Sequence, residues 1–370
     1  LNKHLNSDIL LIRMKGKIST TSKSPEQLIT QSLDQFFAEN IKAAEAVDKH
    51  YAVLWQELNR LVRSGGKRMR PRITIMCYQA FGGSDVQSII SIATAQELLH
   101  QCLMIHDDII DRDHKRYGVE NISGRYKKLY KPYVKESLDL EHYSLSAALL
   151  AGDLLLSSAH QLIAESTIDP TIKQRVHAIF SQSIFNVAGG ELLDTESAFR
   201  PVADISTKTI AKYKTASYSY VGPLLIGATL ANADSASCAA LRVFAEDLGI
   251  AFQLRDDILG VFGNEDTTGK SNETDIKEGK YTHLVECLLQ KLDKKETAIF
   301  NTVFGNQSAS AEQIQQIRDL FVSSGALEQV EEKIASYESS ARKELDFLQL
   351  NKEYRELFEE LINKSVRRDH

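Results

Sequence analysis

Apolar residues recur three and four positions apart along most of this chain, a period that places them on one face of an α-helix. The segment that starts Pro25-Glu-Gln-Leu-Ile shows this period, and Ser24 precedes it as a predicted N-cap. None of the six prolines follows Pro223, so the second half of the chain favours continuous helix. No stretch alternates between apolar and polar residues as a half-buried strand does. We therefore predict an all-α protein, a single bundle of long antiparallel helices, with long apolar helices over residues 84–111, 144–164, 173–196, 205–231 and 235–261.

The predicted helices are separated by breaks that do not resemble interdomain linkers. Two breaks are short and contain the glycine pairs at 65–66 and 82–83. Two are longer: residues 118–143 form a polar, tyrosine-rich connection, and residues 263–280 are predicted to form a loop. The chain is therefore expected to form one domain.

That single domain is predicted to cover residues 25–370, preceded by a disordered N-terminal arm, residues 1–24. The arm carries more basic than acidic residues but lacks an apolar core followed by small residues, so we do not expect a secretory signal; a mitochondrial presequence remains an alternative. We also expect no transmembrane segment, because no apolar run approaches the roughly 18 residues needed to cross a bilayer.

Charge and cysteine content exclude several classes of protein. The formal net charge of −6 argues against a general nucleic-acid-binding surface. The four cysteines stand far apart and form no pair at disulfide or zinc-ligand spacing. We therefore expect a reducing, cytoplasmic environment.

The sequence Asp107-Asp108-Ile109-Ile110-Asp111 ends one of the apolar helices. Asp107 and Asp111 are one turn apart, so their β-carbons are expected to lie about 5–6 Å from each other on one face. Adjacent carboxylates repel, and Mg²⁺, which prefers oxygen ligands, removes that repulsion. Taken alone, the cluster fits a solvated acidic face equally well.

A second acidic pair, Asp256 and Asp257, lies on another apolar helix and favours the metal-binding interpretation. Two such helices suggest a metal-lined opening above an apolar interior. A diphosphate group also needs cations, and the sequence Gly65-Gly-Lys-Arg-Met-Arg-Pro71 supplies three. Further lysines stand at Lys214 and Lys270.

Taken in order, these motifs resemble those of trans-isoprenyl diphosphate synthases. The resemblance covers about residues 25–350 and rests on the segments GGKRMRP, DDIID, Lys214-Thr215, Phe252-Gln253 and Gly269-Lys270, together with His100. It implies a helical bundle around a deep apolar cavity, usually dimeric, hence a homodimer. It also implies a Mg²⁺-dependent prenyltransferase, with three ions per site, that joins isopentenyl diphosphate to an allylic diphosphate.

The resemblance assigns roles to particular residues. The residues that would bind metal are Asp107, Asp111, Asp256 and Asp257. The residues that would contact the allylic diphosphate are Arg116, Lys214 and Lys270. The residues that would bind isopentenyl diphosphate are Lys67, Arg70 and His100, although His100 taken alone fits an ordinary core histidine. Phe252 and Gln253 would line the space between the substrates, and Thr215 and Gln253 would stabilise the carbocation.

The sequence departs from the family pattern at three places. Gly260 replaces the last aspartate of the second motif, Tyr117 replaces a second arginine after Arg116, and Glu191 replaces a glutamine after Gly190. The first two departures keep open the alternative of a non-catalytic subunit of a heteromeric synthase. A terpene cyclase is a further alternative, but it would leave the GGKRMRP segment without a purpose.

The resemblance implies that product length depends on the residues one and two turns before the first motif, here Leu99, Cys102 and Leu103. Short-chain members of the family often carry an aromatic residue at this level, and this chain has none. The resemblance therefore predicts a product longer than farnesyl, namely geranylgeranyl or a longer polyprenyl diphosphate, made from a farnesyl or shorter primer.

Overall fold

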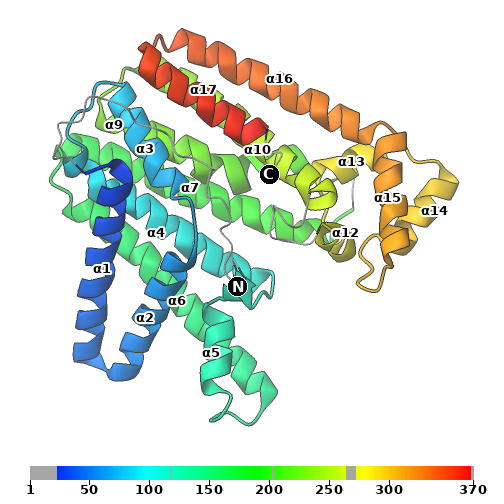
Figure 1. The fold of residues 1–370 in the computed structure, drawn as a ribbon, viewed down its shortest axis with the longest axis horizontal. Helices are drawn as coiled ribbons and strands as arrows, with labels where there is room; N and C mark the ends of the chain where they lie inside the picture. The colour runs from blue at the N-terminus through cyan, green and yellow to red at the C-terminus, as the bar shows by residue number, and fades with distance from the viewer. Residues whose placement is uncertain (1–22, 117, 202–203, 264–271, 368–370) are drawn as a thin grey trace, which may run out of the picture. The chain divides into compact units, whose positions relative to one another are not determined.

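The computed structural model describes residues 23–116, 118–201, 204–263 and 272–367 (Figure 1). These residues are mostly helical, which confirms the predicted all-α class. They form two compact units. The first contains the residues up to Ile75, Asp85–Lys115 and Val119–Ser166, and the second contains Met76–Ser84 and the chain from Thr167 onward. The single domain over 25–370 stays a prediction, and all but two residues of the predicted arm lie outside the described residues.

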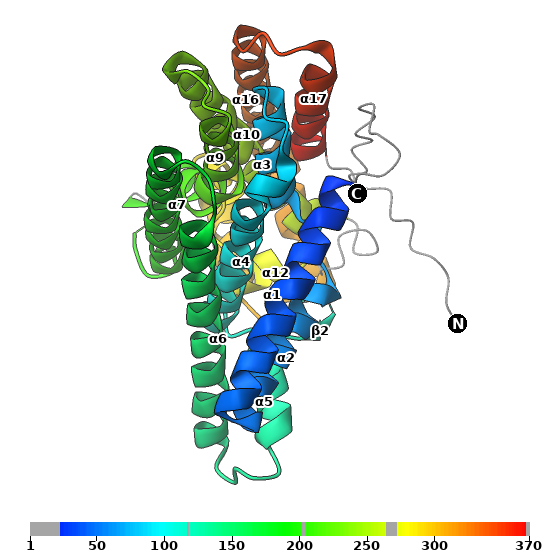
Figure 2. The same ribbon diagram turned by 90° about the vertical axis from the view of Figure 1, so that its left-hand side faces the viewer.

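The first unit is built around a pair of long helices, α4 and α6, which lie against each other (Figure 2). Gly152 of α6 permits this approach, because a β-carbon there would lie 2.1 Å from Nε2 of His106 on α4. Ser24 caps α1 in a reciprocal capping box with Gln27, as its sequence predicts. The elements of this unit are α1 (Pro25–Val47), α2 (Lys49–Ser64), α4 (Val86–Ile110), β2 (Val119–Glu120), α5 (Ile122–Tyr130) and α6 (Ser137–Glu165).

The second unit packs around α10, which contacts the π-helix η2 and the long C-terminal helices α16 and α17. Phe244 of α10 meets Phe358 of α17 with ring centroids 5.5 Å apart, and both rings are fully buried. The elements of this unit are α7 (Pro170–Ser197), α8 (Thr207–Ile210), η2 (Ala211–Val221), α9 (Gly222–Leu230), α10 (Ser235–Phe262), α12 (Thr274–Glu278), α13 (His283–Leu289), α14 (Lys294–Val303), α15 (Ala311–Ser323), α16 (Ala326–Phe347) and α17 (Lys352–Val366). Two further elements, α3 (Met69–Ala80) and the strand β1 (Lys115–Arg116), contain residues of both units.

The structure corrects three details of the predicted elements. Residues 118–143 are not one long connection, because Asn121 caps the helix α5 and α6 already begins at Ser137. Residues 263–280 include the short helix α12. The third correction concerns residues 205–231, which form α8, η2 and α9 instead of one α-helix.

Pro223 offers a physical reason for this interruption. It has no N–H to donate, and in a regular α-helix its ring would collide with the carbonyl four residues earlier. The π-helix Ala211–Val221 ends directly before the Gly222-Pro223 pair and so changes the hydrogen-bond register there. Such segments are often found at functional sites.

Candidate active site

The first acidic motif lies at the C-terminal end of α4, as predicted. The backbone N–H of Asp111 donates to Asp107 O at 2.8 Å, so the helical turn extends through both residues. The last turn of α4 contains no basic residue. The negative end of the helix dipole therefore adds to the repulsion between these carboxylates. A donor set of carboxylate oxygens with this excess of negative charge fits Mg²⁺.

The predicted isopentenyl diphosphate residues also lie in the first unit. Lys67 is exposed in the loop between α2 and α3, Arg70 is half-buried in the first turn of α3, and His100 is half-buried on α4. The middle residue of the basic segment behaves differently. Arg68 turns inward and pairs with the buried Glu97 of α4 at 2.6 Å.

The predicted catalytic residues meet in the second unit. They line a cavity of about 70 Å³ between η2, α10 and the segment that begins α13. Four of the lining residues were predicted from the sequence, namely Lys214, Thr215, Gln253 and Asp257. They come from positions far apart along the chain.

Hydrogen bonds join the polar residues of this cavity into a chain. The Thr215 hydroxyl donates to Gln253 Oε1 at 2.5 Å, and Gln253 Nε2 donates to Asp257 Oδ1 at 2.9 Å. This arrangement fixes the orientation of the Gln253 amide. Its carbonyl oxygen is directed toward the hydroxyl and its amino group toward the carboxylate.

Lys214 is held by two acids of α7 that the sequence analysis did not select for this role. Its Nζ lies 2.6 Å from Asp194 Oδ2 and 3.0 Å from Glu191 Oε2. The close approach of the two helices depends on Gly190, where a β-carbon would lie 2.1 Å from Lys214 N. Glu191 is the residue that replaces the family's glutamine after Gly190, and in the structure it forms an ion pair with Lys214.

Electrostatics in this cavity are dominated by the buried Asp257 and by Lys280, which lines the same cavity. Burial raises the pKa of Asp257 to about 7, while Lys280 and the Gln253 hydrogen bond oppose the rise, and Asp275 and Asp256 add to it. Burial alone would lower the pKa of Lys280, but Asp275 and Asp257 more than offset this and the pKa is raised. Lys280 thus keeps its positive charge beside Asp257 and Asp275. Lys280 was not among the predicted site residues, although it follows a glycine at the end of the predicted loop, as Lys270 does within it.

Gly260 lies directly against Asp275. A β-carbon at position 260 would stand 2.0 Å from Asp275 Oδ2. The carboxylate of Asp275 therefore occupies the space that a third aspartate of the second motif would need.

The remaining predicted residues have the following positions. Phe252 is half-buried on α10, with its ring centroid 5.7 Å from that of Tyr220. Asp256 is half-buried on the same helix, and Arg116 belongs to β1. Lys270 and Tyr117 lie outside the described residues.

The predicted product-length residues lie on α4, before the first motif. Leu99 and Cys102 are each 1% exposed, and Leu103 is half-buried. Cys102 Sγ lies 3.8 Å from Nδ1 of His106. Leu99 and Leu103 instead share the helix face of Asp107, at intervals of four residues.

Within the parts of the chain that the structure describes, no three His, Cys, Asp or Glu side chains stand together as a ready metal site. The two acidic motifs belong to different units, Asp107 and Asp111 to the first and Asp256 and Asp257 to the second.

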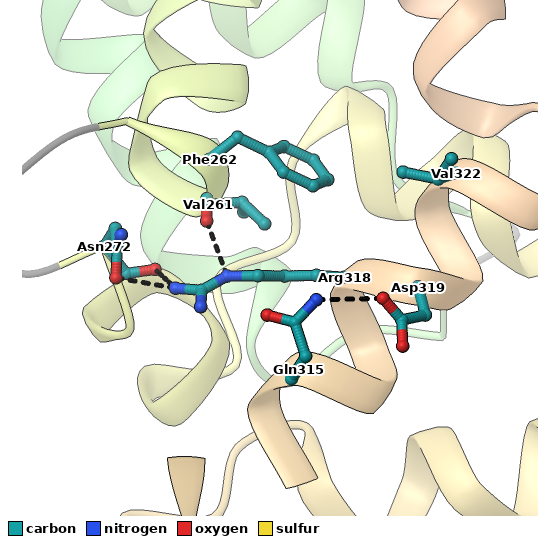
Figure 3. Close-up of a pocket in the computed structure, with 7 residues that line it drawn as sticks. All are labelled: Val261, Phe262, Asn272, Gln315, Arg318, Asp319 and Val322. Atoms are coloured by element: carbon teal, nitrogen blue, oxygen red, sulfur yellow. Dashed lines mark hydrogen bonds between the residues drawn. The ribbon is translucent and has the colours of Figure 1, made fainter. Parts of the chain in front are cut away.

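A larger cavity, of about 200 Å³, lies at the end of α10 beside α15 (Figure 3). Arg318 crosses it and donates from Nε to Val261 O at 2.9 Å and from Nη2 to Asn272 Oδ1 at 2.6 Å. Asn272 Nδ2 in turn donates to Gly263 O at 2.9 Å. Arg318 therefore ties together the residues on either side of segment 264–271. Of the described residues in the predicted site, none lines this cavity.

A helical fold with an acidic motif ending one helix and a Lys-Thr-Gln-Asp constellation on two others defines an isoprenoid-synthase class of protein. The chain belongs to the polyprenyl synthetase family, whose model matches residues 52–321. This confirms the resemblance inferred from the motifs.

Relatives with known names agree with this assignment. Geranylgeranyl diphosphate synthase of Sulfolobus acidocaldarius is 33% identical over 303 residues, which cover 78% of this chain and 84% of that protein. Geranylfarnesyl diphosphate synthase of Aeropyrum pernix is 31% identical, over 76% of this chain and 83% of that protein. Among solved structures, geranylgeranyl pyrophosphate synthase of Corynebacterium glutamicum, complexed with isoprenyl diphosphate and magnesium, superimposes with a TM-score of 0.85 at 30% identity, covering 93% of this chain and 98% of that one.

Proposed function

We propose that this protein is a Mg²⁺-dependent prenyltransferase that condenses isopentenyl diphosphate with a farnesyl or shorter allylic diphosphate. The observation that carries the proposal is the cavity of the second unit, which gathers Lys214, Thr215, Gln253 and Asp257 as the family motifs require. Membership of the polyprenyl synthetase family supports it. The product is geranylgeranyl diphosphate or a longer chain, in agreement with the names of the relatives.

The residues would act first on the leaving diphosphate of the allylic substrate. Lys214 and Lys280 supply positive charge within the cavity, and Arg116 and Lys270 are proposed to add more. Mg²⁺, proposed as three ions held by the acidic motifs, would neutralise the charge that develops on this diphosphate. The allylic carbon–oxygen bond breaks, and its electron pair leaves with the diphosphate.

The new carbon–carbon bond then forms from the double bond of isopentenyl diphosphate. Lys67, Arg70 and His100 would hold its diphosphate, and a proton is finally lost from its carbon chain to the released diphosphate. Thr215 and Gln253 would stabilise the intervening carbocation through their oxygen dipoles, which the hydrogen-bond chain orients. Apolar surroundings would keep water from the cation.

The direct test is turnover of the purified chain. Labelled isopentenyl diphosphate is incubated with Mg²⁺ and geranyl, farnesyl or geranylgeranyl diphosphate, and product length is read by chromatography. Elongation that stops when EDTA is added supports the proposal, and the longest product defines the chain length. A folded protein that elongates no primer would support the alternative of a non-catalytic subunit instead.

Replacing Asp107 by alanine tests the metal assignment. Removing one ligand of a bridged carboxylate pair is expected to lower turnover at least a thousandfold and to leave the circular-dichroism spectrum unchanged. Asp139→Ala, which removes an exposed acid from the start of α6, is the matched control. Wild-type turnover by Asp107→Ala would remove Asp107 from the metal site.

We also propose that the protein is a homodimer. The helices α6 and α7 each carry several exposed apolar side chains: Leu149 and Leu150 of α6 are 51% and 58% exposed, and Phe185 and Leu192 of α7 are 75% and 60% exposed. Covering such side chains with a second copy is favourable, and stable dimers bury more than about 1,000 Å². The mass measured by light scattering in dilute solution tests this proposal.

The helix α6 also has the length and hydropathy of a membrane span, although 44% of its most apolar window is buried within the protein. We propose that a second copy covers its exposed side, and that the protein is cytoplasmic. The free thiols of Cys77, Cys102, Cys238 and Cys287 support a reducing compartment. Fractionation of cells that express the tagged chain would test the location, with membrane pelleting as the contrary result.

A further inference from the structure

Arg68, in the loop between α2 and α3, joins two helices of the first unit, α2 and α4. Its Nη1 lies 2.6 Å from Glu97 Oε1 of α4, and its Nη2 donates to Val62 O in the last turn of α2. The same Glu97 oxygen accepts a hydrogen bond from Gln101 Nε2 at 2.9 Å. The Glu97 side chain is 1% exposed and that of Arg68 is 21% exposed, so the pair is shielded from water.

The backbone of this loop also depends on Arg68. Gly66 has φ +102° and Arg68 has φ +49°, both in the left-handed region. For a residue with a side chain this conformation costs about 1–2 kcal/mol, so other contacts must hold it. The guanidinium packs over Gly66, where a β-carbon would lie only 3.2 Å from Arg68 Nη1. The contacts of the Arg68 side chain are therefore suited to hold the loop in its shape.

The loop carries two of the predicted substrate residues. Lys67 directly precedes Arg68, and Arg70 follows it by two positions. Glu97 lies one turn before His100 on α4, the helix that ends in the first acidic motif. The Arg68–Glu97 pair thus fixes the positions of Lys67 and Arg70 relative to His100.

We propose that Arg68 and Glu97 are positioning residues for the diphosphate of isopentenyl diphosphate. The pair acts through Lys67, Arg70 and His100, and so rests on the proposed role of those three residues. A buried ion pair adds little stability compared with apolar residues of the same size, whereas its geometry is specific. Its contribution is expected in substrate affinity more than in the free energy of unfolding.

The deciding experiment separates these two contributions. In Glu97→Gln and in the double variant Arg68→Met with Glu97→Met, KM for isopentenyl diphosphate is expected to rise at least tenfold. KM for the allylic diphosphate should change less than twofold. The double variant replaces the pair with apolar residues, so its melting temperature should stay near that of the wild type. A wild-type KM for isopentenyl diphosphate in a folded double variant would overturn the proposal.

Two further variants serve as controls. Glu26→Gln removes the ion pair with Arg72, 3.2 Å long, which anchors α3 one turn beyond the loop. Glu26→Gln should leave both KM values unchanged. If it raised KM for isopentenyl diphosphate as much as Glu97→Gln does, the effect would not be specific to the Arg68–Glu97 pair. Lys67→Ala tests the underlying assignment: if it does not raise KM for isopentenyl diphosphate, the assigned site is wrong, whatever Arg68 does.

Discussion

At the scale of single residues, Gly260 shows that a departure from a family motif can be matched by a neighbouring side chain. The Asp275 carboxylate occupies the place of its missing side chain, and Asp275 is also a charge partner of Lys280. A side chain at 260 must displace that carboxylate. We expect Gly260→Ala to lower turnover at least tenfold, and Gly260→Asp to lower it further instead of restoring a motif.

The measurement is kcat with saturating substrates over a range of Mg²⁺ concentrations. Gly189→Ala on α7 is a matched control, because a β-carbon there has no neighbour within 4 Å. Increased activity of Gly260→Asp would instead show that position 260 lost a functional carboxylate.

Product length is set at the same scale. Leu103→Phe is expected to shorten the longest product by at least one isoprene unit, because Leu103 is half-buried one turn before Asp107 on the same face. Cys102→Phe should also shorten the product if Cys102 lines the cavity. It carries the added cost of overpacking a fully buried site, about 1–3 kcal/mol.

Chromatography of the products and the melting temperature, measured on both variants, separate these effects. Unchanged products from a stable Leu103→Phe variant would show that the cavity ends elsewhere. A short product from Cys102→Phe alone would place the end of the cavity on the side of α4 that carries Cys102 and His106.

At the scale of helices, the start of α13 connects to α8 through a buried histidine. His283 Nδ1 lies 2.8 Å from Thr207 Oγ1 and 2.9 Å from Glu286 Oε2. Burial lowers the pKa of His283, and the hydrogen bond and charge of Glu286 only partly oppose this. The neutral ring is therefore the favoured form in the folded protein.

This shift predicts a pH dependence of stability. Because the unfolded chain binds a proton at His283 more readily than the folded protein, the contribution of His283 is present at higher pH. It is lost as the pH falls below the ordinary histidine pKa of about 6.5. Urea denaturation from pH 8 to pH 5.5 should show a smaller loss of unfolding free energy in His283→Asn than in the wild type. Parallel curves for the two proteins would contradict this.

At the scale of the whole molecule, the all-helical fold was predictable from the sequence because the apolar period of each helix is a local pattern. Contacts between residues far apart in the chain leave no such local pattern, and these contacts were missed. Sequence does not distinguish the inward Arg68 from its outward neighbour Lys67, since burial is a tertiary property. Lys280 and Asp275 gained their importance only through contacts with residues near the end of α10. The π-helix escaped detection because its apolar residues remain consistent with a helical period.

Assembly belongs to this scale as well. If α6 faces a second copy, Leu150→Glu should convert the dimer to a monomer, because it places a charge in an apolar contact. Phe347→Glu is the matched control, because Phe347 lies at the end of α16 and is also 58% exposed. Sedimentation velocity measures both variants. A dimeric Leu150→Glu protein would exclude this face as the interface.

The π-helix Ala211–Val221 also sets two evolutionary pressures against each other. Deleting one of its eleven residues, together with a substitution of Pro223, would allow the ordinary α-helical register, the commoner form, but would turn Lys214 and Thr215 by about 100° relative to the residues beyond the deletion. Selection for heat tolerance alone should therefore favour shorter versions of this segment. Selection for turnover should preserve the length of the segment, so active relatives are expected to keep the same number of residues there.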